Sequence, residues 1–105
     1  MRLKLTNAEM NALCHELGGV LTSFENRKIR GDEFQMQDKL AKALTERIWI
    51  ILNKKSFNQQ PTYSFELPPE LTIFLYCLFS GREAYSDFSK NMLLKLCNQI
   101  HQHFA

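Results

Sequence analysis

The residues best suited to bind a metal ion are Cys97, His101 and His103, close to the C-terminus. Cys97 and His101 stand four residues apart, so on one helix both side chains could reach a single ion. The only other cysteine and histidine grouping is Cys14 beside His15, and no two cysteines have a metal-binding spacing. Structural zinc sites usually present four closely organised ligands. The sequence therefore predicts no metal site, and Cys97 is expected on an apolar helix face.

Cys14 and His15 are also the only candidates for a nucleophile with an adjacent base. Neighbouring residues of a helix point in different directions, whereas a base must lie within hydrogen-bond reach of its nucleophile. The eleven acidic residues are scattered along the chain, and no glycine-rich phosphate loop is present. We therefore expect no catalytic residue and no cofactor, and predict that the protein is not an enzyme.

Basic residues occur in two groups that could contact nucleic acid phosphates. Arg27, Lys28 and Arg30 form the first group, and Lys54 and Lys55 form the second. Acidic residues flank the first group, the formal net charge is only +2, and no helix-turn-helix spacing is visible. A small nucleic-acid-binding protein that uses these five residues is the alternative function.

The cysteines and the lengths of the apolar runs predict where in the cell the protein is located. Each of the three cysteines falls in an apolar stretch that reads as helix, as expected of reduced core residues in a cytoplasmic protein. The longest apolar runs cover residues 48–52 and 73–79, far short of the roughly 20 residues of a membrane span. We predict a cytoplasmic protein that does not enter the membrane.

A pattern at residues 2–9 returns at residues 64–71 in different letters. Each copy alternates apolar and polar residues and then leads into a helix start, so each predicts a short strand followed by a helix. We expect strands at about Arg2–Leu5 and Tyr63–Glu66, paired antiparallel if the two halves are related by a pseudo-two-fold axis. The half-repeats would cover about residues 1–56 and 57–105, and both shared local structure and common ancestry stay open as explanations.

Helical periodicity and start signals predict four helices. Thr6 and Glu9 form a capping box before the first helix, and the prolines at 68 and 69 suit the first turn of the third. Gly18-Gly19 either weakens the first helix or admits a closely packed neighbour. The expected ranges are Thr6 to about Asn26, Asp32 or Glu33 to about Lys54, Pro68 to Phe79, and Ser86 to His103. The third helix is apolar on nearly all sides, so we expect it at the centre.

These elements define one domain, residues 1–105, of mainly α class. Four helices pack with a small two-stranded antiparallel β-ribbon in the order β-α-α-β-α-α. On the second helix, Leu40, Leu44 and Ile48 are assigned to the core stripe, with Met36 and Ile50 at its side. The core is expected to contain Leu13, Leu17, Leu44, Ile48, Phe74, Leu75, Leu78, Leu96 and Ile100.

Two features favour a protein interaction module. Trp49 and Ile50 lie outside the central stripe of the second helix, and Trp49 is expected on the side facing water, where an aromatic residue can anchor an interface. The outer edge of a two-stranded ribbon can also pair with another chain. We therefore predict a non-catalytic interaction or regulatory accessory protein that binds itself as a homodimer or binds another protein.

Overall fold

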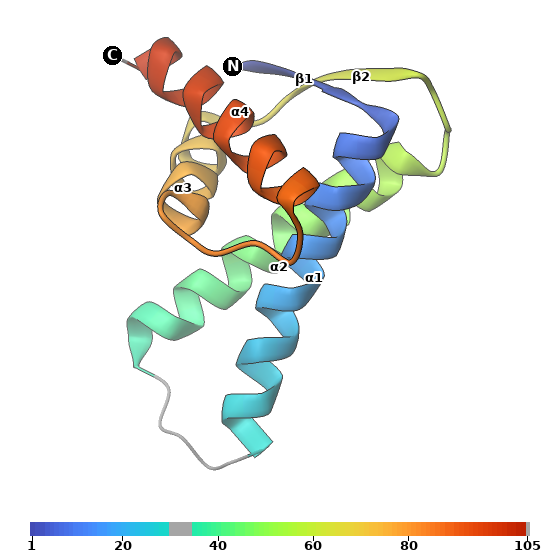
Figure 1. The fold of residues 1–105 in the computed structure, drawn as a ribbon. Coiled ribbons are helices and arrows are strands. Elements are labelled where there is room, and N and C mark those ends of the chain that lie inside the picture. The colour runs from blue at the N-terminus through green and yellow to red at the C-terminus, as the bar shows by residue number, and fades with distance from the viewer. Residues whose placement is uncertain (30–34, 105) are drawn as a thin grey trace.

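A two-stranded antiparallel ribbon brings the two halves of the chain together (Figure 1). In the computed structural model, β1 (Arg2–Thr6) pairs with β2 (Thr62–Glu66), and Leu3 lies opposite Phe65. Both strands bury every second residue, so one face of the ribbon covers the helices and the other meets solvent. The predicted ribbon is confirmed, one residue longer in each strand than expected.

The described part of the chain has the predicted order β-α-α-β-α-α and is mainly helical. The helices are α1 (Asn7–Ile29), α2 (Met36–Ser56), α3 (Pro69–Phe79) and α4 (Asp87–Phe104). The structure describes residues 1–29 and 35–104, without the side chains of residues 28 and 29. α1 therefore continues to Ile29, beyond its expected end at about Asn26, and the expected start of the second helix at Asp32 or Glu33 lies outside the described residues.

The helix starts follow from local hydrogen bonding. The Glu9 carboxylate accepts the Thr6 N–H at 2.9 Å and the Thr6 hydroxyl accepts the Glu9 N–H at 3.2 Å, which confirms the capping box. The last residue of α3 is Phe79, and Ser80 caps the helix. Gly81 follows with φ +77°, a conformation that favours glycine. The predicted ends of α1, α2 and α4 differ from the observed ones by a few residues.

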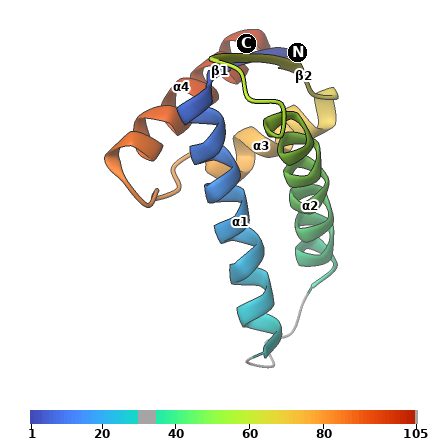
Figure 2. The ribbon, with the colours of Figure 1, turned by 90° about the vertical axis from the view of Figure 1, so that its right-hand side faces the viewer.

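α1 and α2 form an antiparallel hairpin below the ribbon, and α1 has neighbours on most sides (Figure 2). It packs against α2, α4 and both strands, and it buries Met10, Leu13 and Leu17 completely. α1 therefore holds the position that the sequence predicted for α3. The prediction for α3 is wrong because nearly all its residues are apolar, so its pattern does not show which face is covered; Ile73 is 47% exposed and Cys77 is exposed.

Most of the predicted core is confirmed, with three residues at its margin. Leu13, Leu17, Ile48, Leu75, Leu96 and Ile100 are buried. Leu44, Phe74 and Leu78 are half-buried and pack against the core. The buried cluster also takes in the inward side chains of the ribbon, so the two strands and the helices share one core.

The segment between α3 and α4 packs against the middle of α1 and is hydrogen-bonded to it. The buried carboxylate of Glu16 accepts the Tyr85 N–H at 3.0 Å. The Tyr85 ring occupies the space where a Cβ on Gly19 would stand, since its Oη lies 2.5 Å from that position. His15 meets the same ring edge to face at 5.1 Å. Gly19 therefore admits a close neighbour, which is one of the two roles predicted for the glycine pair.

Candidate interaction surface

α2 carries apolar residues on two opposite faces. Its core face contains Thr45, Ile48 and Leu52, all 0% exposed. The opposite face, called here the outer face of α2, includes Leu40 at 61% and Ile50 at 48% exposure. At 100° per residue, its members fall within about 100° of arc. The outer face consists of Met36, Leu40, Ala43, Arg47, Ile50 and Lys54, and Phe57 continues it at the helix end.

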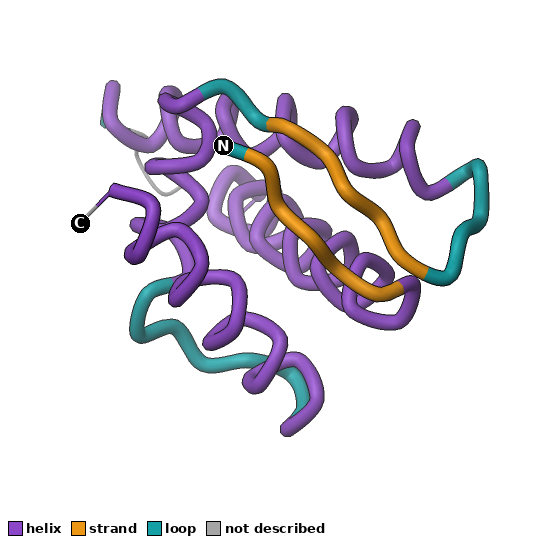
Figure 3. Tube along the Cα trace, turned by 90° about the horizontal axis from the view of Figure 1, so that it is seen from above, coloured by secondary structure: helices purple, strands orange, loops and turns teal. Residues whose placement is uncertain are grey.

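The spacing of the outer face alternates between four and three residues along the whole helix. This spacing keeps the row straight enough to meet another helix along its length. Met36 and Phe57 at the two ends are 78% and 86% exposed. Seen from above, α2 lies along one side of the molecule (Figure 3). The outer face is thus a continuous, partly apolar surface.

The two residues singled out in the sequence lie in different settings. Ile50 belongs to the outer face, as the prediction of an exposed apolar residue requires. Trp49 is 37% exposed, and its Nε1 lies 3.8 Å from the position of a Cβ on Gly18 of α1. Trp49 is thus exposed as expected, but the side of α2 that carries it does not face water throughout. That side faces α1, where Thr45 is buried and Lys42 forms an ion pair with Glu25 at 3.0 Å.

Leu40 and Met36 are the surface residues that the sequence prediction missed. Leu40 was assigned to the core stripe and Met36 to its side, yet both point to solvent. When a helix has apolar residues on two faces, the sequence alone does not separate the two sets, and they are taken for one broad apolar stripe. The alternating spacing from Met36 to Phe57 was the available signal for a second, separate row.

The basic residues do not form a single phosphate-binding surface in the described structure. Arg27 binds Asp38 through two contacts, of 3.2 and 3.3 Å, and this hydrogen bonding lowers the pKa of the Asp38 carboxyl. Lys54 and Lys55 lie at the other end of α2, about 27 Å from its start. The side chain of Lys28 and all of residue 30 lie outside the described residues. The two groups are therefore far apart, and part of the first is already neutralised.

The outer edge of β1, one candidate for pairing with another chain, is covered by a side chain of α4. The Gln99 amide accepts the Lys4 N–H and donates to the Lys4 carbonyl, both at 3.4 Å. A side-chain amide thus stands where a neighbouring strand would pair. The helical face of α2 is therefore a more accessible surface than the β1 edge.

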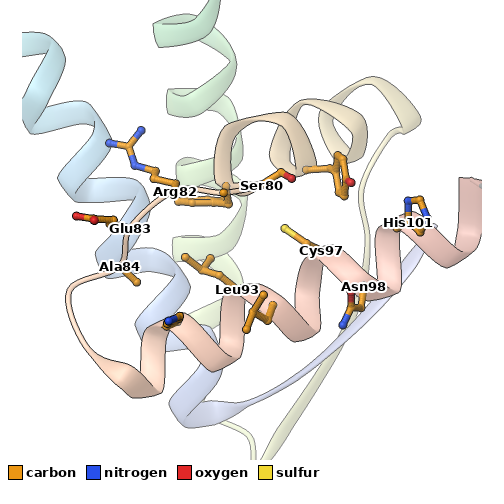
Figure 4. Close-up of a pocket in the computed structure, with 13 residues that line it drawn as sticks. Ser80, Arg82, Glu83, Ala84, Leu93, Cys97, Asn98 and His101 are labelled. Carbon is orange, nitrogen blue, oxygen red and sulfur yellow. The ribbon is translucent and has the colours of Figure 1, made fainter.

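A groove of about 650 Å³ lies between α3, the following loop and α4 (Figure 4). Cys97 and Leu93 line it from α4, and the His101 ring stacks on Tyr76 with a centroid separation of 6.2 Å. The charged ends of Arg82 and Glu83 point away from the groove (Figure 4). Its polar groups therefore do not converge on a common point, as they would in a small-molecule site.

Of the three cysteines expected in the core, Cys14 and Cys97 are half-buried and pack against it, whereas Cys77 is exposed, so the expectation is wrong for Cys77. Burial raises the pKa of the Cys14 and Cys97 thiols, which lowers their thiolate fraction and so their reactivity. Among the described residues, no cluster of three or more histidine, cysteine or acidic side chains could hold a metal ion. None of the described helices combines the length and apolarity needed to cross a membrane.

We compared the chain with known protein families, curated proteins and solved structures. No protein-family model, curated protein or solved structure matches the chain. The case for a function therefore depends on the geometry of the chain itself.

Proposed function

We propose that this chain is a non-catalytic protein–protein interaction module that forms a homodimer through the outer face of α2. The observation that carries the proposal is the row of exposed apolar residues opposite the core face of the helix, with Leu40 at 61% and Ile50 at 48% exposure. Single exposed apolar residues are common on soluble proteins, whereas several exposed apolar residues aligned on one helix face mark an interaction site more often.

The size of the row sets the expected strength of the dimer. The segment from Met36 to Lys54 is about 27 Å long, and two helices that pack over such a length bury on the order of 1,000 Å² in total. This area lies near the lower limit for a specific interface. We therefore expect a dimer that forms in the micromolar range and separates on dilution.

Ile50 is the proposed anchor of this interface, and Trp49 has a supporting role. Ile50 lies near the middle of the outer face, where burial excludes water most completely. Trp49 packs against Gly18 and so helps to hold α2 on α1. Its substitution would therefore disturb the fold as well as the surface, which makes Ile50 the cleaner position for a test.

Light scattering over a range of concentrations tests the proposal. We expect the wild-type mass to approach twice the monomer mass of 12.3 kDa as concentration rises. Ile50→Glu should hold the protein at the monomer mass, because a carboxylate cannot be buried in an apolar interface without a partner. Loss of one central anchor typically costs about 2 kcal/mol or more, a change of roughly 30-fold in the dissociation constant.

Ile73→Glu is the matched control, because Ile73 on α3 is 47% exposed and does not belong to the outer face of α2. It should leave the dimer intact, and circular dichroism should show unchanged helix content in both variants. A wild-type protein that stays monomeric at high micromolar concentration would refute the homodimer. Equal loss of mass in both variants would refute the assignment to α2.

A further inference from the structure

The outer face of α2 complements a second copy of itself only when the two helices run in opposite directions. In a parallel pair, equivalent residues face each other, so Arg47 would meet Arg47 and Lys54 would meet Lys54. Like charges in direct opposition disfavour such a pairing. The parallel helix dipoles would add a further unfavourable contribution. The proposed homodimer therefore calls for an antiparallel arrangement.

One antiparallel register matches large residues with small ones. With the two-fold axis at the level of Thr45, Leu40 of each copy lies opposite Ile50 of the other. Arg47 then lies opposite Ala43, whose small side chain leaves room for the long arginine stem. Lys54 falls opposite Met36 near the ends of the contact, where its ammonium group reaches water.

The charges on α2 complete this match. In the described part of the chain, Arg47 has no ion-pair partner. Glu46 lies beside the outer face and approaches only Lys42, at 3.9 Å, while Lys42 binds Glu25 more closely, at 3.0 Å. Glu46 is therefore free to bind a second cation. Helical side chains lean toward the N-terminus, which directs Arg47 toward the level of Glu46 in an antiparallel neighbour.

From this arrangement we propose that a second copy of the chain packs antiparallel on the outer face of α2, with Arg47 of each copy paired to Glu46 of the other. This inference rests on the proposed homodimer and specifies its geometry. The interface then has an apolar Leu40–Ile50 contact at each side of the axis and two ion pairs close to it. Lys39 remains on the Glu46 side at the solvent-facing margin.

Charge-reversal variants test the pairing. Glu46→Arg and Arg47→Glu should each weaken self-association by about tenfold or more, since each places like charges together at the two-fold axis. An equimolar mixture of the two variants should form a heterodimer with an affinity within about threefold of wild type. The double variant, which exchanges the two charges within one chain, should recover self-association in the same way. Analytical ultracentrifugation of the separate and mixed proteins measures all four cases.

Ala43→Leu supplies a second, independent measurement. The added side chain fills the space assigned to Arg47 of the other copy, so dimerisation should weaken by about tenfold. Helix stability should not fall, because leucine is also a strong helix former and Ala43 is exposed. Lys55→Glu, which lies on α2 outside the outer face, is the charge control and should leave dimerisation close to wild type.

The outcomes separate this inference from the proposed function. If Ile50→Glu abolishes the dimer but the mixed charge variants do not reassociate, the antiparallel pairing is overturned while the homodimer stands. If the wild type is monomeric under all conditions, both fail. Reassociation of the mixture, combined with loss of dimer in Ala43→Leu, supports the antiparallel register.

Discussion

The glycine pair in α1 shows how a missing side chain shapes this fold. Gly19 leaves room for the ring of Tyr85, whose Oη lies 2.5 Å from the position of a Cβ, whereas a Cβ on Gly18 would stand at an ordinary contact distance of 3.8 Å from the indole of Trp49. Each glycine costs α1 about 1 kcal/mol of helix stability relative to alanine. At Gly19 the contact with the Tyr85 ring offsets that cost, so this glycine of the pair is required by packing.

Substitution of Trp49 separates its fold-stabilising role from an interface role. Because Trp49 is only 37% exposed and packs on Gly18, we expect Trp49→Ala to lower the free energy of unfolding by about 1–3 kcal/mol. Urea denaturation at a concentration below the dimer range measures this effect without contributions from association. If the urea concentration at the unfolding midpoint does not change, the indole makes no net contribution to packing. Trp49 would then be a candidate interface residue, as the sequence predicted.

At the scale of elements, α2 is a helix that the described part of the molecule covers on one face only. Its core face packs against α1 and α3, and its outer face carries Leu40 and Ile50 into solvent. Ion pairs at its first turns, Arg27–Asp38 and Lys42–Glu25, tie it to the end of α1. These contacts fix the rotation of α2 about its axis and so determine which apolar residues remain outside.

The two faces of α2 should respond differently to the same substitution. Leu52→Ala removes a fully buried side chain and should cost about 2–5 kcal/mol of stability. Leu40→Ala removes an exposed one and should change monomer stability by no more than about 0.5 kcal/mol, while weakening dimerisation. Denaturation of the dilute monomer, followed by light scattering at high concentration, distinguishes the two effects. A large loss of monomer stability in Leu40→Ala would place Leu40 in the core after all.

At the scale of the whole molecule, Glu9 links the first helix turn to the last helix. Burial by itself would raise the pKa of Glu9, but hydrogen bonds from Thr6 and Lys95, together with the Lys95 charge, hold it below its ordinary value of 4.5. The Lys95 ammonium lies 2.9 Å from the carboxylate. Two residues 86 positions apart in the chain therefore share one ion pair.

This contact predicts a dependence of stability on pH. Because the folded state lowers the pKa of Glu9, its contribution is fully present above the ordinary value of 4.5 and is lost as the pH falls through the lower, folded value. Glu9→Gln should therefore destabilise the protein at neutral pH, and its difference from wild type should shrink below pH 4.5. Glu66→Gln, on the solvent face of the ribbon, controls for the loss of one charge. A difference for Glu9→Gln that stays constant from pH 3 to pH 7 would contradict this role.

Local signals determined the elements and their order. Three of these signals are the capping box at Thr6 and Glu9, the prolines at the start of α3, and the alternation of apolar and polar residues in both strands. Each depends on residues that are close together in the sequence, so each can be recognised without the structure. Antiparallel pairing of β1 with β2 was also predicted, from the pattern shared by the two halves. The common ancestry of those halves remains a hypothesis.

Tertiary structure alone decided which apolar faces are covered. α1 and not α3 occupies the centre, Trp49 faces α1, and Leu40 faces solvent. Burial depends on the rotation of each helix and on which neighbour approaches it, and contacts such as Lys42–Glu25 fix both across segments distant in sequence. Periodicity shows that a residue is apolar and on which side of its own helix it stands. It does not show whether another element covers that side, and for this reason the outer face of α2 emerged only from the folded molecule.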